Sequence, residues 1–452
     1  MLFKRKIYQK LKEWKENSKG TTSILVEGAR RIGKSTVVEE FAEKEYDSYI
    51  LIDFAKKDAA VERFFLEHMN DLDTLFMLLS TYYHVNLVRR HSVIVFDEVQ
   101  AFPFARAATK YLVADGRYDY IATGSLISIR ENVKDILIPS EEESIQMYPM
   151  DYGEFCEALG ESQILEYIKY CYDRKIPLER GLHNKAMLLF RQYMLVGGMP
   201  QSVAAFVEDQ KNFQRSDSLK RGILRIYHSD IMKIDRRYKT VVAGMFDEIP
   251  ANLSKHEKRV TFRNLDTRGD SSDTQKALFW LREAMITNQC FRTSDSSAAL
   301  ALNADESFVK CYLSDTGLLF SQAFDENSLL KDDVYRQILN DRLSLNEGMF
   351  YENVVAQMLV AGGHKLYFYT QYNREKGRND IEIDFIISNN NKLKYRMYPI
   401  EVKSGTNYSI VSLQRFMEKY RSRIGQAYVI HPRNFMIKDD IVYLPPYMVP
   451  YL

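Results

Sequence analysis

Short apolar runs alternate with longer amphipathic stretches over the first 160 residues of this chain. Ile7, Leu11 and Trp14 recur at helical spacing, which predicts a helix over residues 4–17. The apolar runs are continuous, as is typical of parallel strands that are covered on both faces. The order predicts an α/β fold with a five-stranded parallel sheet. The predicted strands lie within 24–26, 49–54, 92–100, 118–125 and 144–150, and the predicted helices lie at 36–44, 58–90 and 151–159.

A mostly helical middle region follows, and its end has the element order of a winged helix. Residues 160–240 are predicted to be helical and charged, with a turn at 197–200. In a winged helix that binds DNA, the third helix lies in a groove, and here its exposed side would carry Gln275, Lys276 and Arg282. DNA binding and a role in protein contacts both remain open. The three predicted helices and the two strands that would pair as a wing lie at 241–253, 261–267, 272–285, 286–293 and 308–313.

The last third of the chain alternates again between helix and strand. A helix is predicted at 351–359, and strands are predicted at 366–369, 381–387 and 398–402. This pattern predicts a second α/β domain.

The composition is that of a globular protein, with 46% hydrophobic residues, 27% charged residues and a net charge of +1. A balanced charge predicts no overall attraction to nucleic acid or membrane, and the basic cluster at 211–239 is either a solvated helix face or a local nucleic-acid stripe. None of the four cysteines forms a C-x-x-C pair, which predicts reduced thiols in a cytoplasmic protein. The basic N-terminus has no continuous apolar stretch, which argues against a signal peptide. No later segment approaches the roughly 18 apolar residues of a membrane span, so we expect no membrane partner.

The stretch at 23–36, SILVEGARRIGKST, carries the clearest chemistry. The apolar run ends in Gly28, and the spacing Gly28-x-x-x-x-Gly33-Lys34-Ser35 is the P-loop pattern. Glycines allow the loop to curl so that its backbone N–H groups point at phosphate oxygens. The following helix presents its positive dipole end to the same anion.

This pattern predicts that the chain binds ATP with Mg²⁺. Lys34 would reach the β- and γ-phosphates and is a catalytic candidate, and the Ser35 hydroxyl would bind the metal. An accidental glycine-rich turn is the alternative. The residues predicted to bind the nucleotide are Gly28, Ala29, Arg30, Arg31, Ile32, Gly33, Lys34, Ser35 and Thr36.

Two further strand ends supply candidate partners for the P-loop. Asp97 and Glu98 follow a predicted strand at its carboxyl end, where ligands bind in an open α/β sheet. Asp97 would hold Mg²⁺ through water or Ser35, and Glu98 would polarise the attacking water. A solvated acidic turn is the alternative. Another predicted strand, at 118–125, ends in small polar residues, of which Thr123 or Ser125 would hydrogen-bond the γ-phosphate or the water. A plain strand–turn explains them almost as well.

The last strands carry a candidate second site. Asp384 lies on one predicted strand, the next strand ends in Glu401-x-Lys403, and Glu352 lies on the helix before them. Alternation places Glu401 and Lys403 on the same face, so the acids would bind Mg²⁺ and Lys403 would orient or activate water. The pattern resembles the metal site of restriction-endonuclease-like proteins, although Ile383 stands where a proline is usual. A polar strand edge and a fold of this type without cleavage activity are the alternatives.

The motifs GARRIGKS, VIVFDEVQ, IATGS and MYPMDYGEFCEAL together resemble the AAA-like ATPases of bacteria and archaea. In that family a C-terminal domain of unknown function follows, and YMLVGGMPQSV, YHSDIMKI, CYLSDTGLLF and FYENVVAQML resemble it. By this similarity, the strand expected at 49–54, between the P-loop and Asp97, marks the ATPase subclass with a catalytic glutamate. Arg106, Arg117 and Arg130 all remain candidates for an arginine finger.

These patterns predict an AAA-like P-loop NTPase domain at 1–160, a helical and winged-helix region at 161–325, and a restriction-endonuclease-like α/β domain at 326–452. The leading function is an Mg²⁺-dependent ATPase coupled to nucleic-acid binding or remodelling, with cleavage left open. The alternative is a non-enzymatic ATP-gated switch that binds a protein partner and carries an inactive nuclease-like domain. ATP is the expected ligand, DNA and a protein are candidate partners, and the oligomeric state is open.

Overall fold

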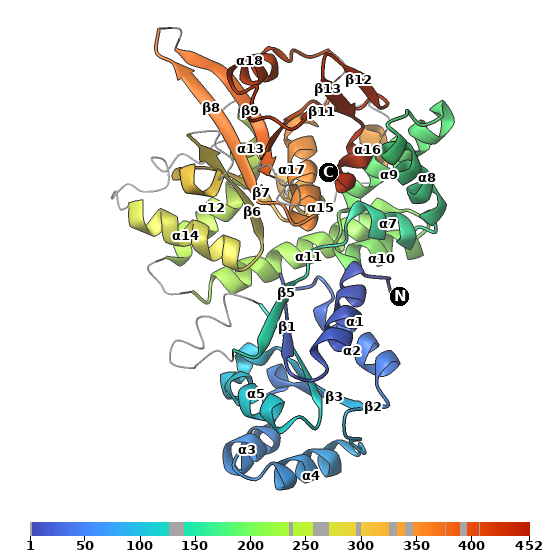
Figure 1. The fold of residues 1–452 in the computed structure, drawn as a ribbon, viewed down its shortest axis with the longest axis vertical. Helices are drawn as coiled ribbons and strands as arrows, with labels where there is room; N and C mark the ends of the chain where they lie inside the picture. Colours follow the sequence, from blue (N-terminus) through green and yellow to red (C-terminus); the bar gives the residue numbers. More distant parts are fainter. Residues whose placement is uncertain are drawn as a thin grey trace. The chain divides into compact units, whose positions relative to one another are not determined.

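The chain forms two compact units, which are described separately below (Figure 1). One consists of residues 1–148 with 283–285, and the other of 149–282 with 286–452. The predicted helix at 261–267 lies outside the described residues, and the predicted domain boundaries at 160 and 325 stay a prediction. The computed structural model describes residues 2–125, 140–234, 238–255, 271–294, 300–324, 332–339, 347–375, 377–388, 396–405 and 407–452.

The first unit is built on a five-stranded sheet in which neighbouring strands are all parallel, which confirms the predicted parallel α/β sheet. The strand order is β2-β3-β4-β1-β5. Every residue of β1, β3 and β4 is buried, as expected for strands that are covered on both faces. The strands are β1 (Ser23–Glu27), β2 (Ser48–Asp53), β3 (Ser92–Asp97), β4 (Asp119–Gly124) and β5 (Glu142–Gln146).

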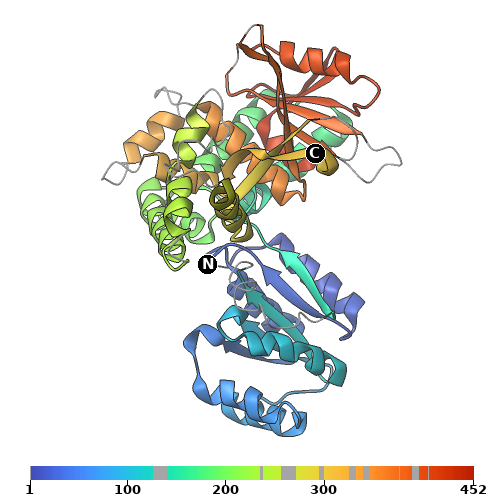
Figure 2. The ribbon, with the colours of Figure 1, turned by 90° about the vertical axis from the view of Figure 1, so that its left-hand side faces the viewer.

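The helices of this unit pack around the sheet (Figure 2). The predicted apolar stripe of α1 is buried. The stretch predicted to be helical at 58–90 contains two helices, because the Asp71 carboxylate caps the second by accepting from the Thr74 N–H at 3.2 Å. His84, at φ 55°, then ends that helix. The helices are α1 (Lys6–Ser18), α2 (Lys34–Glu45), α3 (Ala59–His68), α4 (Leu72–Tyr83) and α5 (Pro103–Asp115), with short 3₁₀ turns η1 (Phe54–Lys56) and η2 (Val99–Ala101).

In the sheet, the strand inserted between β1 and β3 is β4. This corrects the expectation that the inserted strand is the one at 49–54, which is β2. β1 pairs with β4 through Val26 and Thr123, and β4 pairs with β3 through Ala122 and Phe96. β2 pairs with β3 and lies at the edge of the sheet. Sheet order differs from chain order because parallel strands are joined by crossovers, which can skip a neighbour. Thr123 therefore ends its strand between the P-loop strand and Asp97.

The second unit begins with a helical region. Its first helix, α7, starts with a capping box in which Asp151 and Glu154 each accept from the other's backbone N–H, at 2.9 and 3.1 Å. The helix predicted at 241–253 is two helices, because Pro250 has no N–H to donate and stands in the first turn of the second. The helices are α7 (Tyr152–Ala158), α8 (Ser162–Arg174), α9 (Arg180–Val196), α10 (Pro200–Glu208), α11 (Phe213–Ile231), α12 (Lys239–Asp247), α13 (Ile249–Ser254) and α14 (Ser271–Glu283).

An eight-stranded mixed sheet forms the rest of the second unit, in the order β12-β13-β11-β10-β9-β8-β6-β7. α18 packs on one face through Leu413 and Phe416, and α17 lies on the other face (Figure 1). No helix in the described ranges is both long enough and apolar enough to span a bilayer. The elements are β6 (Thr287–Thr293), η4 (Leu300–Asn303), β7 (Ala304–Leu313), α15 (Thr316–Ala323), α16 (Asp332–Leu339), α17 (Glu347–Ala361), β8 (Leu366–Asn373), β9 (Arg378–Ser388), β10 (Met397–Val402), α18 (Val411–Lys419), β11 (Ala427–Ile430), β12 (Met436–Lys438), β13 (Ile441–Leu444) and η5 (Pro446–Tyr451).

The two strands predicted as a wing do pair, but they do not form a separate hairpin. β6 and β7 are antiparallel, with Cys290 opposite Lys310. β6 also pairs in parallel with β8 through Cys290 and Leu366. The winged-helix prediction is corrected at this point, because the hydrogen bonds on the second edge of β6 extend the C-terminal sheet.

Candidate functional site

The P-loop connects β1 to α2 at the carboxyl end of the first sheet. Arg31 (φ 69°) and Gly33 (φ 91°) adopt left-handed backbone conformations, which turn the chain so that α2 begins at Lys34. No side chain caps this helix, so its first-turn N–H groups are available to an anion. At Gly28, an added Cβ would lie 2.5 Å from the backbone oxygen of Met147, closer than real Cβ atoms approach. The loop therefore has backbone donors available for a phosphate, and it passes too close to Met147 for a side chain at position 28.

The side chain of Lys34 is buried against the backbone of this loop. Its ammonium donates to the backbone carbonyls of Gly28 at 3.0 Å and Ala29 at 2.9 Å. Burial lowers the pKa of Lys34 to about 8, although the carboxylates of Glu98 and Asp97 act in the opposite direction. Phosphate oxygens are stronger acceptors than carbonyls, so these donors can pass from the loop to a bound phosphate.

The other predicted loop residues divide by exposure. Arg30, Arg31 and Thr36 are exposed, whereas Ala29 and Ile32 are buried. The exposed side chains project from the loop, and the buried ones fix it to the domain.

Asp97, at the end of β3, accepts hydrogen bonds from the first turn of α2 and from the end of β4. Its Oδ1 accepts from the Ser35 hydroxyl at 2.8 Å and also from the Thr123 hydroxyl. The Thr123 oxygen in turn accepts from the backbone N–H of Glu98 at 3.2 Å. This set joins the P-loop helix to the ends of β3 and β4. Ser125, the other candidate on β4, is buried just beyond the strand.

Glu98 leaves β3 in a left-handed conformation, with φ 51°. Its carboxylate accepts from the side-chain amide of Gln100. Gln100 was not predicted, although it stands in the same short motif. The Thr123 hydroxyl donates to the Asp97 carboxylate and accepts from the Glu98 N–H, so Thr123 holds both residues in place.

These side chains fit ATP with Mg²⁺. The hydroxyl of Ser35 and the carboxylate of Asp97 are hard oxygen ligands of the kind that Mg²⁺ prefers, and they already lie within hydrogen-bond distance of each other. Lys34 and the uncapped first turn of α2 supply donors for the phosphates. The donor set therefore suits a magnesium-bound triphosphate.

Two of the three candidate arginine fingers are engaged within the first unit. Arg106 is buried and forms a two-pronged ion pair with Glu142, at 2.6 and 3.1 Å. Arg117 pairs with Asp115 and Asp73. Arg130 lies outside the described residues.

Another arginine contacts the P-loop from the start of the chain. Arg5 donates to the carbonyl of Ile32 at 2.8 Å and to that of Tyr148 at 2.7 Å. Sequence reasoning missed it, because Arg5 meets these carbonyls only after folding.

The residues predicted for a second site gather in one cluster of the second unit. The Val402 N–H donates to Asp384 at 2.9 Å, and the Lys403 ammonium donates to Glu401 at 2.6 Å. Burial and the nearby charge of Asp384 raise the pKa of Glu401. Burial lowers the pKa of Lys403, but the carboxylates of Glu401, Asp384 and Glu352 raise it by more. The four predicted residues in the cluster are Glu352, Asp384, Glu401 and Lys403.

A lysine that the sequence analysis did not single out lies within this cluster. Lys310 on β7 is 2% exposed, and its Nζ lies 3.8 Å from carboxylate oxygens of both Glu382 and Asp384. Burial lowers the pKa of Lys310, but Glu352 and these two acids raise it by more. In the described ranges, no group of three or more His, Cys, Asp or Glu residues has an arrangement that would hold a metal ion. Lys310 thus places a buried positive charge beside the carboxylates of Glu382 and Asp384.

The helix expected to enter a DNA groove, α14, keeps part of its predicted basic side. Lys276 donates to the Tyr238 hydroxyl at 3.1 Å and lies 3.7 Å from Asp273. The Arg282 guanidinium lies 5.3 Å from the centre of the exposed Phe279 ring. In the basic cluster at 211–239, Lys220 is fully buried. The prediction that this cluster forms a solvated helix face is therefore wrong for Lys220.

Three parts of the chain match known protein families. Residues 21–156 match a family described as an AAA domain, which confirms that the first unit carries an AAA-family P-loop ATPase domain. Residues 187–328 match a domain of unknown function, DUF8612, and residues 347–447 match another, DUF4143. No curated protein matches the chain.

Two solved structures resemble parts of the fold at low identity. Cdc6p from Pyrobaculum aerophilum is 11% identical, with 75% of this chain and 94% of that chain covered and a TM-score of 0.24. A Signal Transduction ATPase with Numerous Domains from Pyrococcus horikoshii, which has a tetratricopeptide repeat sensor, is 9% identical, with 78% and 48% covered and a TM-score of 0.26. At such scores neither structure carries an argument about this chain.

Proposed function

We propose that the protein binds ATP with Mg²⁺ at the P-loop and hydrolyses it, with Glu98 polarising the attacking water. The observation that carries this proposal is the hydrogen-bond set of Ser35, Asp97 and Thr123, which joins the phosphate loop to the strand end that bears Glu98. Such a set holds a metal-binding carboxylate and a water-polarising carboxylate on adjacent residues.

Each side chain has a separate role in this mechanism. Lys34 moves its donors from the loop carbonyls to the triphosphate, and the first turn of α2 binds the same oxygens. Mg²⁺ held by Ser35 and Asp97 would neutralise charge on the phosphates. Glu98 orients a water and takes up its proton as the water oxygen attacks the γ-phosphorus, which releases ADP and phosphate.

A test of this role is the isosteric change Glu98→Gln. It should leave ATP binding intact and lower turnover by roughly 10²–10⁴-fold, because the water loses its acceptor. Lys34→Ala should instead weaken ATP binding. Glu39→Gln, an exposed change on α2, is the matched control and should hydrolyse ATP as the wild type does. Wild-type turnover in Glu98→Gln would overturn the assignment.

We further propose that hydrolysis is coupled to nucleic acid through α14. A cleft of about 310 Å³ on this helix is lined by Lys276, Phe279 and Arg282, which combine two cations with an exposed aromatic ring. ATP turnover should rise on adding duplex DNA, and Lys276→Glu with Arg282→Glu should reduce both the rise and the binding seen by fluorescence anisotropy. Binding should weaken with salt in proportion to the phosphates contacted. Salt-independent binding, or no effect of these changes, would exclude this surface.

A second candidate is an ATP-gated switch whose nuclease-like domain does not cleave. Lys310 favours it, because this lysine already neutralises Asp384 and Glu382. Plasmid DNA should then stay intact with Mg²⁺ or Mn²⁺ in both the wild type and Asp384→Ala. Metal-dependent cleavage that Asp384→Ala abolishes would rule this candidate out.

A further inference from the structure

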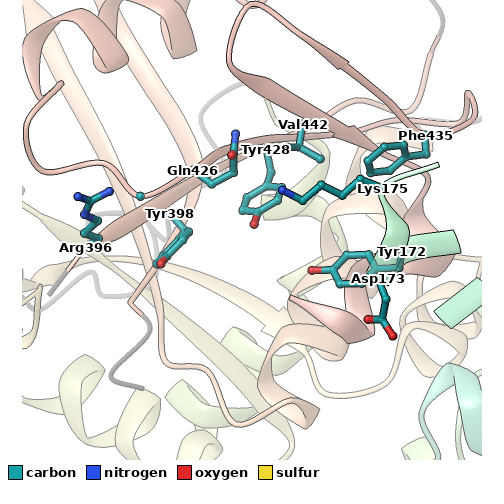
Figure 3. Close-up of a pocket in the computed structure, with 10 residues that line it drawn as sticks. Tyr172, Asp173, Lys175, Arg396, Tyr398, Gln426, Tyr428, Phe435 and Val442 are labelled. Atoms are coloured by element: carbon teal, nitrogen blue, oxygen red, sulfur yellow. The ribbon is translucent and has the colours of Figure 1, made fainter. Parts of the chain in front are cut away.

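A cleft of about 650 Å³ lies in the second unit, between the end of α8 and the strands β10 and β11 (Figure 3). Tyr398 and Tyr428 come from the two strands, and Tyr172 and Lys175 come from the end of α8. The volume falls within the range of ligand pockets, roughly 300–1,000 Å³.

Two tyrosine rings form an aromatic platform in this cleft. The ring centres of Tyr398 and Tyr428 are 6.5 Å apart and their planes are 28° from parallel. Both residues lie on the same face of neighbouring parallel strands, since Tyr428 is opposite Ile400, two residues from Tyr398. Gly425 allows this arrangement, because a Cβ there would lie 2.7 Å from the Tyr398 ring.

The cleft also carries cations that are not neutralised by neighbours. Within the described part of the chain, neither Lys175 nor Arg396 forms an ion pair, whereas Asp173 is paired with Lys169 at 2.7 Å. Figure 3 shows the Lys175 side chain reaching across the cleft toward Tyr428, with Arg396 at the other end beside Tyr398. The cleft therefore combines aromatic faces with a net positive charge.

Hydrogen bonds beside the cleft join the segment that follows Lys175 to the segment that precedes Phe435. The backbone N–H of Leu178 donates to the Asn434 side chain at 3.1 Å, and that side chain donates back to the Leu178 carbonyl at 2.7 Å. Tyr172 also packs on Tyr451, with ring centres 5.3 Å apart. A preformed cleft loses little ordering entropy when it binds a ligand.

We propose that this cleft binds a nucleoside phosphate, with the base on the rings of Tyr398 and Tyr428 and the phosphate paired with Lys175 and Arg396. Every nucleobase has a face that stacks on aromatic side chains, and phosphate pairs with lysine and arginine. The ligand is either a free nucleotide or one residue of a single strand. This site is separate from the P-loop, and the proposal does not depend on ATP hydrolysis.

The neighbouring surface favours the free nucleotide. A second cleft, of about 990 Å³, shares Lys175 with the first and adds Arg421, but it also carries Glu418, Asp439 and Asp440. Three carboxylates beside two cations would repel a polyanionic strand that continued into it. A single nucleotide avoids this repulsion.

The test uses the full chain with Lys34→Ala, so that the P-loop no longer retains nucleotide, and measures binding of AMP and of a ten-residue oligodeoxyadenylate by calorimetry. AMP should bind, and Tyr398→Ala and Lys175→Glu should each weaken binding about tenfold or more, as loss of a stacking ring commonly does. Gly425→Ala should weaken it too, by displacing the Tyr398 ring.

The controls are Tyr170→Ala, on the same helix but outside the cleft, and Lys211→Glu, an exposed lysine with the same left-handed backbone as Lys175. Both should bind AMP as the parent does. Tighter binding of the oligomer than of AMP, if Tyr398→Ala and Lys175→Glu both weaken it, would support the site and identify a single strand as the ligand's source. Absence of binding by both probes, or binding that survives Tyr398→Ala and Lys175→Glu, would overturn the proposal, while the Glu98→Gln assay tests the ATPase independently.

Discussion

Gly28 stands where β1 passes into the P-loop, and the space for a side chain there is already filled by Met147 and Ile32. Gly28→Ala should therefore push the loop away from its neighbours, weaken ATP binding and lower the melting temperature. Gly222→Ala is a matched control, because nothing lies within 4 Å of its added Cβ and the site is helical. There the change should be neutral or stabilising by up to about 1 kcal/mol. Equal ATP affinity in Gly28→Ala and the wild type would contradict this account of the loop.

Lys220 gives the second prediction at this scale. It is fully buried on α11, donates to the Leu195 carbonyl at 2.6 Å and lies near Asp217 and Asp315. Burial lowers its pKa to about 8, although the two acids act against this. Between pH 8 and the ordinary value of 10.5, the unfolded chain holds a proton that the folded chain has lost, so this residue makes stability rise with pH across that window.

Lys220→Met should remove that contribution. Urea unfolding of the full chain at several pH values between 7.5 and 10 should show a smaller rise in stability with pH for Lys220→Met than for the wild type. Lys211→Met, at an exposed lysine, should follow the wild type. Parallel curves for Lys220→Met and the wild type would show that the lysine keeps its ordinary pKa.

The sequence predicted the roles of residues best where all the interacting groups lie close together in the chain. Lys34 and Ser35 follow from spacing alone, since the loop and the helix that starts there are continuous in the chain. The only sign of Lys310 in the sequence is that it is a single lysine within the apolar run VKCYL. That run does not indicate that its partners are Glu382 and Asp384. Those contacts exist only because the sheet brings distant strands within reach of one side chain.

At the scale of elements, strand existence was predictable and strand neighbours were not. The apolar runs predicted β1 to β5. The placement of β4 between β1 and β3 depends instead on which strand each crossover connection skips, and the apolar runs do not specify this. That placement makes Thr123 a partner of Asp97. In the same way, the pairing of β6 with β7 was predicted. The pairing of β6 with β8 was not, because β8 lies more than 50 residues further along the chain.

Lys310 ties together strands that are not neighbours, because β8 and β6 separate β7 from β9. Lys310→Met should destabilise the second unit by about 3–5 kcal/mol, since it leaves buried carboxylates without their cation. Adding Asp384→Asn should recover part of this loss, because one of those charges is then removed. Urea unfolding of the single and double variants measures both effects. No destabilisation in Lys310→Met would show that the cluster does not depend on this lysine for its charge balance.

At the scale of the whole molecule, the sheet pairing bears on where the chain can be cut. β6 and β7 precede residue 326, but they complete the sheet that β8 to β13 build after it. A fragment of residues 326–452 would therefore expose the edge of β8 and lose Lys310 from the acid cluster. The fragment 149–452 keeps both, and the fragment 1–148 keeps the whole P-loop sheet.

We expect 1–148 and 149–452 each to unfold cooperatively, and 1–148 to bind ATP. The fragment 326–452 should unfold without cooperativity or aggregate, because an unpaired strand edge and uncompensated buried carboxylates destabilise it. Thermal melts followed by circular dichroism compare the three, and Lys34→Ala in 1–148 is the control for specific ATP binding. Cooperative unfolding of 326–452 at the temperature of 149–452 would mean that the last strands form an independent domain and that β6 and β7 only dock against it.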